Sequence, residues 1–180
     1  MEIQSPNFIK NYFLEKLLST RLYFIREKSE ITNFLEQIKE ARKILIILPR
    51  DRAEEIIARK YLPEFHKIFK PARVSTLDIM NLRDSDVNWI GIPNNFYMSK
   101  ITNQHYELIL DLNSAHDTLC SYLAAMIKAP LRIHLVQGKY DKIYNIQIRS
   151  DNDTSLEGRY GNFLNYLRRM RQSVAMMPVG

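Results

Sequence analysis

Residues 43–48 read KILIIL, a continuous aliphatic run of strand length that ends at Pro49. An unbroken apolar run, in place of an alternation of apolar and polar residues, is typical of a strand buried on both faces of a parallel sheet. Three later segments have the same character: 72–79 (ARVSTLDI), 106–112 (YELILDL) and 131–136 (LRIHLV). Helical patterns at 52–69 and 115–128 separate these segments and are long enough for crossover connections. This alternation predicts an α/β domain.

The segments around this unit complete the predicted architecture. Residues 87–92 (VNWIGI) form a shorter candidate strand, and residues 142–149 (KIYNIQIR) alternate apolar and polar side chains in the manner of a half-exposed edge strand. Residues 156–170 return to a helical pattern. We therefore expect a three-layer, Rossmann-like, mostly parallel sheet of about five or six strands, followed by a C-terminal helix.

Two amphipathic helices are expected before the first strand. Ser5 and Pro6 supply an N-cap and a first-turn proline to the first helix, and the second begins after Ser29, with Ser29 and Thr32 as candidate caps. Apolar side chains recur at intervals of three and four in both segments, so each should bury one face. The expected organisation is an N-terminal helical extension (1–42), a Rossmann-like domain (43–172) and a tail (173–180).

Composition narrows the class of protein. The chain has 180 residues, 46% of them hydrophobic and 26% charged, which is enough for one sizeable core and excludes a disordered or collagen-like chain. Cys120 is the single cysteine, so we expect no disulfide and a reducing, cytoplasmic location. Charged residues interrupt the N-terminal apolar residues, and no apolar stretch approaches the roughly 18 residues of a membrane span. We expect neither a signal peptide nor a membrane span.

The net charge of +6, from 26 Lys and Arg against 20 Asp and Glu, permits several anionic partners. Nucleic acid, anionic lipid and phosphorylated small molecules all fit such a balance. The basic pairs at 42–43, 59–60 and 168–169 are spread over the chain and interleaved with acids, which argues against nucleic acid. The best local exception is the group at 168–171, which either contacts phosphate or complements the end of its helix dipole.

Ligands of open parallel sheets bind outside the carboxyl ends of the strands, where helix N-termini point their free amides outward. The loop after the first strand places Arg50 and Arg52 at a helix start, an arrangement suited to a phosphate or carboxylate. The alternative is that Asp51 caps the helix while the two arginines are solvated or pair with the glutamates at 54 and 55. The loop has no glycine, so it is neither a P-loop nor a dinucleotide fingerprint.

The loops after the later strands add further candidates. Asn113 and Ser114 are candidate ligand contacts, with helix capping as the alternative, and Lys139, in the loop after the strand at 131–136, is a further candidate for binding an anion. Asp51 and His116 are weak catalytic candidates, because no G-x-S-x-G elbow surrounds Ser114 and adjacency in sequence does not make a catalytic triad. No histidine has the spacing of a metal site, so we expect no metal and no cofactor.

Two stretches resemble a known family. Residues 42–79, from RKILIILPRDRAEEII to ARVSTLDI, and residues 106–135, YELILDLNSAHDTLCSYLAAMIKAPLRIHL, are similar to the ADP-heptose:lipopolysaccharide heptosyltransferase-like glycosyltransferases of family 9. They also resemble small stand-alone proteins of unknown function that keep only this half. The resemblance implies the acceptor-side, Rossmann-like half of a GT-B glycosyltransferase. Since the domain that binds the nucleotide-sugar donor in that family has no counterpart here, we expect no complete transferase site.

The leading hypothesis is a ligand-binding or protein-interaction module that is not an enzyme by itself and takes an anionic or sugar-like small molecule. The first alternative is a small enzyme acting on a phosphorylated or sugar-like substrate, with Arg50 and Arg52 as anion clamps and Asp51 or His116 as proton-transfer groups. The second is weak nucleic-acid binding. A homodimer is also expected to be possible, since two apolar-faced helices are added to a sheet domain that does not need both.

Overall fold

The computed structural model describes residues 6–24, 33–89, 91–136, 143–148 and 154–172. Its strands form one five-stranded sheet in the order β2-β1-β3-β4-β5, and every neighbouring pair is parallel. The strand bounds are Lys43–Ile47 (β1), Arg73–Leu77 (β2), Leu108–Asp111 (β3), Leu131–His134 (β4) and Ile146–Gln147 (β5). Four of the predicted strands are therefore confirmed, and the predicted edge strand at 142–149 is present as the short β5.

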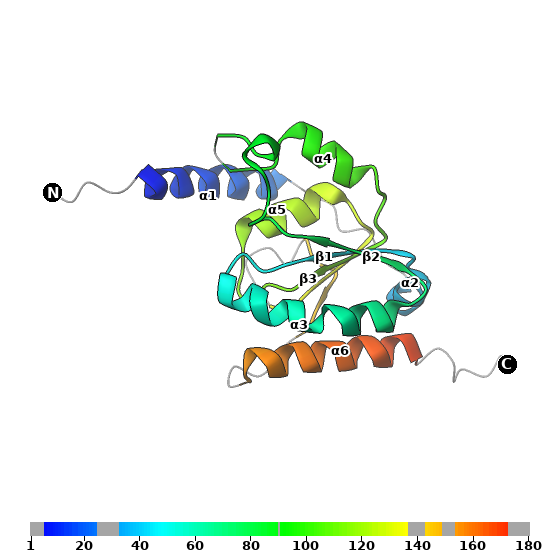
Figure 1. Cartoon of the computed structure of the whole chain (residues 1–180). Helices are drawn as coiled ribbons and strands as arrows, with labels where there is room; N and C mark the ends of the chain where they lie inside the picture. Colours follow the sequence, from blue (N-terminus) through cyan, green and yellow to red (C-terminus); the bar gives the residue numbers. More distant parts are fainter. Residues whose placement is uncertain (1–5, 25–32, 90, 137–142, 149–153, 173–180) are drawn as a thin grey trace.

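Helices cover both faces of the sheet, so the predicted three-layer α/β architecture is confirmed (Figure 1). One layer contains α1 (Pro6–Phe24), α4 (Asn95–Thr102) and α5 (Thr118–Ile127). The other layer contains α2 (Phe34–Glu40), α3 (Arg52–Phe69) and α6 (Leu156–Gln172). No helix in the described residues is long and apolar enough to cross a membrane.

The aliphatic run of β1 is explained by its two buried faces. Leu45 and Ile47 pack in the core under α5, whereas Ile44 and Ile46 pack in the core over α3 and α6. All four side chains are at most 2% exposed. A strand between two helical layers has no polar face, because successive side chains point to opposite sides of the sheet and both sides are covered.

The two N-terminal helices join different layers. In α1, Leu14, Leu18 and Leu22 recur every fourth residue and are buried in the core that α5 shares. In α2, Ile38 is buried in the opposite core, beside α6. The start of α2 corrects the sequence prediction: Asn33 caps it by accepting a hydrogen bond from the Glu36 amide, while the predicted caps at 29 and 32 lie outside the described residues.

The predicted strand at 87–92 is wrong. Val87 and Pro93 form an isolated antiparallel bridge, which belongs to a tight reversal of the chain. The Gly91 amide donates to the Asn88 carbonyl, and Gly91 has a φ of 92°, a backbone conformation that glycine adopts without steric cost. Turn-forming residues inside the apolar run thus close a local loop. The short helix α4 that follows was not predicted, and the predicted tail at 173–180 lies outside the described residues.

Candidate functional site

The candidate site lies at the carboxyl ends of β1 and β3, where the strand order reverses. β1 pairs with β2 on one side and with β3 on the other. The chain leaves β1 toward α3, on one face of the sheet, and leaves β3 toward α5, on the opposite face. The two loops diverge there. Such a topological switch point is where doubly wound sheets bind their ligands.

Arg50 and Asn113 tie these two loops together. The Arg50 amide donates to Oδ1 of Asn113 over 3.3 Å, and its guanidinium Nη1 lies 3.0 Å from Oδ2 of Asp117. Asp117 also caps α5, because its Oδ1 accepts from the Cys120 amide at 2.8 Å. Arg50, Asn113 and Asp117 therefore converge at the switch point. The Arg50 guanidinium is already engaged with a carboxylate.

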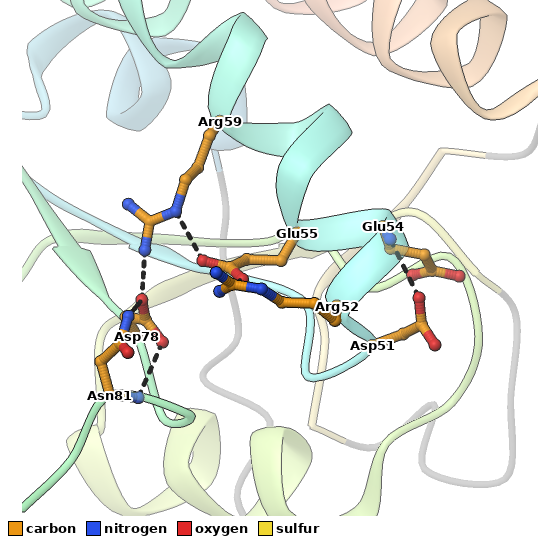
Figure 2. A network of polar contacts seen from close by, with 7 residues as sticks. All are labelled: Asp51, Arg52, Glu54, Glu55, Arg59, Asp78 and Asn81. Atoms are coloured by element: carbon orange, nitrogen blue, oxygen red, sulfur yellow. Dashed lines mark hydrogen bonds and ion pairs between the residues drawn. The ribbon is translucent and has the colours of Figure 1, made fainter.

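Asp51 and Arg52 act at the start of α3. Asp51 is the N-cap and accepts a hydrogen bond from the Glu54 amide at 2.9 Å. Arg52 pairs with Glu55, and Glu55 also accepts from Nε of Arg59 at 2.5 Å (Figure 2). The hydrogen bond from Arg59 is the main reason that the pKa of Glu55 lies below its ordinary value. The capping and pairing alternative thus holds for Asp51 and Arg52, whereas Arg50 pairs with Asp117 and not with a glutamate of α3.

Arg59 extends this network to β2. It pairs with Asp78, the residue after the end of β2, and Asp78 in turn accepts hydrogen bonds from the amide and the side chain of Asn81 (Figure 2). The first two turns of α3 are therefore fixed to the loop after the neighbouring strand. Sequence reasoning predicted the partners of Arg52 within the helix. It had no signal for Asp78, because the contact is made across 19 residues of sequence.

Ser114 is held from the opposite side of the switch point. Its hydroxyl donates to the carboxylate of Glu54 in α3, and its amide donates to the same carboxylate at 3.2 Å. His116 is half-buried, and burial together with the nearby His134 lowers its pKa. Its imidazole is therefore neutral at pH 7. Lys139, the third predicted anion contact, lies outside the described residues.

A buried polar cluster that sequence reasoning missed forms the floor of the site. Asp111, the last residue of β3, accepts hydrogen bonds from the Tyr144 hydroxyl and from Nδ2 of Asn113, the latter at 2.6 Å. The ring of Tyr144 stacks on His134 with centroids 4.5 Å apart, and Nε2 of His134 lies 3.9 Å from Asp111. Burial raises the pKa of the Tyr144 phenol, so that it stays protonated and donates. The available signal was a lone acid inside the aliphatic run at 106–112.

Helix α1 reaches the same edge. Oε2 of Glu15 accepts a hydrogen bond from the Thr118 hydroxyl in the first turn of α5, over 2.6 Å. The described side chains around these loops, which we call the rim, are rich in carboxylates. They come from Glu15, Asp51, Glu54, Glu55, Asp78 and Asp117. The arginines among them are Arg50, Arg52 and Arg59, each in contact with at least one of these carboxylates. Among the described residues, no group of three or more His, Cys, Asp or Glu side chains is arranged to hold a metal ion.

Comparison with known proteins places the whole domain in one family. No curated protein and no solved structure matches the chain. One family model matches residues 10–169, which include every strand in the described part of the chain and all but the ends of α1 and α6. The chain therefore belongs to DUF6913, a family of unknown function.

Proposed function

We propose that the protein is a binding domain for a small, hydroxyl-rich ligand at the switch point between β1 and β3. The main support for this proposal is the convergence of Arg50 with Asn113 and Asp117. Arg50 is separated from these two residues by 63 and 67 positions in the sequence, so the contacts join two distant loops. The strand order reverses between these loops, and open α/β sheets generally bind their ligands at such a point. The hydrogen bonds among the three residues preorganise both loops before any ligand arrives.

The charges at the rim support a sugar-like ligand over a phosphorylated one. Arg50 and Arg52, the predicted anion clamps, are both paired with carboxylates. A phosphate would have to displace Asp117 or Glu55 and then lie next to the displaced charge, which costs several kcal/mol in a partly desolvated site. A neutral polyol instead donates its hydroxyl protons to the carboxylate oxygens that stay accessible, those of Asp51 and Asp117.

A binding experiment with matched ligands tests this proposal. Amide NMR spectra are recorded during titration with D-glucose and, separately, with glucose phosphate. We expect the neutral sugar to shift the amides of residues 49–51 and 113–118. Asp117→Asn keeps a capping side chain for α5 but loses the charge, so it should weaken sugar binding. Arg73→Gln, exposed at the opposite edge of the sheet, is the control and should bind as the wild type does.

Two results would count against the proposal. Tighter binding of the phosphate ester than of the neutral sugar at 49–51 would favour the arginines as anion clamps. Shifts confined to other surfaces, with both switch-point loops unaffected, would show that the loops are bonded for stability alone. The NMR readout distinguishes the two results because it reports where on the chain each ligand acts.

An enzyme with His116 as its base is the alternative function. The lowered pKa of His116 leaves a neutral imidazole that accepts a proton at pH 7. Asp51 is less suited to such a role, because its carboxylate accepts the Glu54 amide as a helix cap. If the alternative holds, His116→Ala abolishes turnover of a sugar or sugar phosphate, and Asp51→Asn, which preserves the cap, leaves turnover intact.

The relation to glycosyltransferase family 9 stays a prediction, as does the homodimer. The relation predicts that this chain alone transfers no sugar from a nucleotide-sugar donor, which an assay of donor hydrolysis and transfer tests directly. Light scattering at increasing protein concentration tests the homodimer, and nucleic-acid binding predicts an affinity that falls steeply as salt is added.

A further inference from the structure

A second candidate site lies away from the switch point, where α3 and α6 end side by side (Figure 1). The two helices run parallel, since Tyr61 contacts Tyr160 near the start of α6 and Glu64 contacts Arg168 near its end. A cavity of about 280 Å³ opens between their last turns. Its lining includes Glu64, Lys67, Ile68, Arg168, Arg171 and Gln172. It therefore contains two of the three arginines, Arg168 and Arg171, of the basic group at 168–171.

The side chains of this cavity carry an excess of positive charge. Arg168 donates to Glu64 over 2.6 Å and to Asn165 over 3.1 Å, which accounts for the one carboxylate in the lining. Lys67 is exposed and makes no hydrogen bond or ion pair with any residue in the described part of the chain. Three cations thus face one anion.

Of the three cations, Arg171 has the charge that neighbouring groups balance least. Its guanidinium lies over the ring of Phe69, 5.1 Å from the centroid, and Nη1 donates to the Ile38 carbonyl at 3.3 Å. Within the described residues it has no carboxylate partner. Burial alone lowers the pKa of Arg171, with no neighbouring acid to offset the shift. A partly buried cation in this state gains from any anion that reaches its remaining N–H groups.

Helix dipoles explain only part of this charge. The C-terminal end of a helix carries about half a negative charge, so two parallel ends attract cations and offset about one unit. The lining holds three cations and Glu64. After the two helix ends and Glu64 are taken into account, positive charge remains at the cavity, and this charge favours the binding of an anion.

We propose that this cavity binds a phosphate group, held by Lys67, by Arg171 and by the N–H groups of Arg168 that its contacts with Glu64 and Asn165 leave open. The planar forks of two arginines match phosphate oxygens, and the lysine adds a point charge at the open side. The volume of about 280 Å³ is at the lower limit for ligand pockets, so it suits a phosphate with a small substituent. Free phosphate and the headgroup of a lipid share this chemistry. The proposal is independent of the function proposed for the switch point.

Calorimetric titration with inorganic phosphate at constant ionic strength tests the site. Lys67→Gln should weaken binding by about threefold to fivefold, the effect of one exposed charge. Glu64→Gln should strengthen it by a similar factor, because it removes the competing anion and frees Arg168. Lys60→Gln, exposed on the same helix but outside the cavity lining, is the matched control and should leave the affinity unchanged.

Arg171→Lys is the second test, because it keeps the charge and removes the fork. It should weaken phosphate binding while the melting temperature stays near that of the wild type. If the wild type binds no phosphate, or if Lys67→Gln and Glu64→Gln both behave like Lys60→Gln, the cations serve only the helix ends and the proposal is overturned. Opposite effects of these two variants would support it, since a role in stability alone does not predict them.

A sedimentation experiment with lipid vesicles distinguishes free phosphate from the phosphate of a lipid headgroup. Phosphatidylcholine vesicles containing phosphatidic acid are sedimented with the protein. If the source is a lipid headgroup, the wild type sediments with these vesicles and inorganic phosphate releases it, whereas a smaller fraction of Lys67→Gln sediments. If the source is free phosphate, the calorimetric binding persists and no protein sediments. Sedimentation that inorganic phosphate does not reverse, together with no calorimetric binding, overturns the site.

Discussion

Nε of Arg59 lies 2.5 Å from Oε1 of Glu55, one helical turn away in α3, and the same guanidinium pairs with Asp78 after β2. The Glu55 side chain is inaccessible to water, whereas Arg52 and Arg59 are 68% and 42% exposed. The carboxylate is therefore covered by its own partners near the surface. A pair so close to the surface contributes less stability than a deeply buried pair does.

Glu55→Ala should lower the free energy of unfolding by about 1–2 kcal/mol, less than the 3–5 kcal/mol lost when one partner of a deeply buried pair is removed. Urea unfolding followed by circular dichroism measures the change. Glu40→Ala, at an exposed position of α2, is the control and should change the stability by less than about 0.5 kcal/mol. A loss for Glu55→Ala no greater than for the control would show that the network contributes nothing.

The Glu55 carboxylate should also make the free energy of unfolding depend on pH, and the direction of this dependence follows from its pKa. The pKa of Glu55 is lowered below 4.5 in the folded protein, mainly by the hydrogen bond from Arg59. A lowered folded-state pKa stabilises the protein above the unfolded-state pKa, and this stabilisation is lost as the pH falls through the folded value. The stability difference between the wild type and Glu55→Gln should thus be constant above about pH 5 and shrink below about pH 4.5. A difference that grows on acidification would contradict this.

The hydrogen bond between Tyr144 and Asp111 should stabilise the floor of the site. Tyr144→Phe removes one donor to a buried carboxylate and should cost about 1–2 kcal/mol. A double-mutant cycle with Asp111→Asn isolates the pair, and we expect a coupling energy above about 0.5 kcal/mol. Additive losses in the cycle would mean that Tyr144 acts through packing alone.

Asn113 should control the loop after β1. Asn113→Ala removes the acceptor for the Arg50 amide and the donor to Asp111. The Arg50 amide should then exchange its hydrogen at least about tenfold faster, because a local opening no longer breaks that bond. Hydrogen exchange followed by NMR measures this effect. Ser114→Ala, which loses only the contact with Glu54, is the comparison and should leave the exchange of the Arg50 amide unaffected.

Cys120 reports on unfolding. It lies in the first turn of α5 and is fully buried in the core, and burial raises the pKa of its thiol well above its ordinary value. Alkylation requires the thiolate, so the native protein should resist iodoacetamide even at mildly alkaline pH. In denaturant the single cysteine should react completely. Rapid labelling of the native protein would show that α5 opens locally.

The sequence predicted the layers well because the patterns there are local. The run at 43–48 is apolar on both faces, and α3 begins and ends at the predicted residues 52 and 69. The prediction of a strand at 87–92 is wrong because the apolar side chains of this segment flank a turn. In that turn the Gly91 amide donates a hydrogen bond to the Asn88 carbonyl. An apolar run of only six residues is too short for its periodicity to distinguish a strand from a loop.

The candidate site was predictable only in part. The positions of Arg50, Asp51 and Asn113 follow from the rule that strand ends carry the site. Their partners do not, since Asp117 and Tyr144 are joined to the site by contacts across 67 and 33 residues of sequence. Which arginine meets which carboxylate depends on the strand order, and a sequence without known topology leaves that order open.

The place of β1 between β2 and β3 constrains how the chain is assembled. Ile44 is paired with Val74 on one side and with Leu108 on the other. During synthesis, β1 and β2 can join through α3 while the edge of β1 that receives β3 is still open. An open, aliphatic strand edge is a template for pairing with other chains. Until β3 emerges, that edge of the nascent protein is therefore open to pairing with other chains.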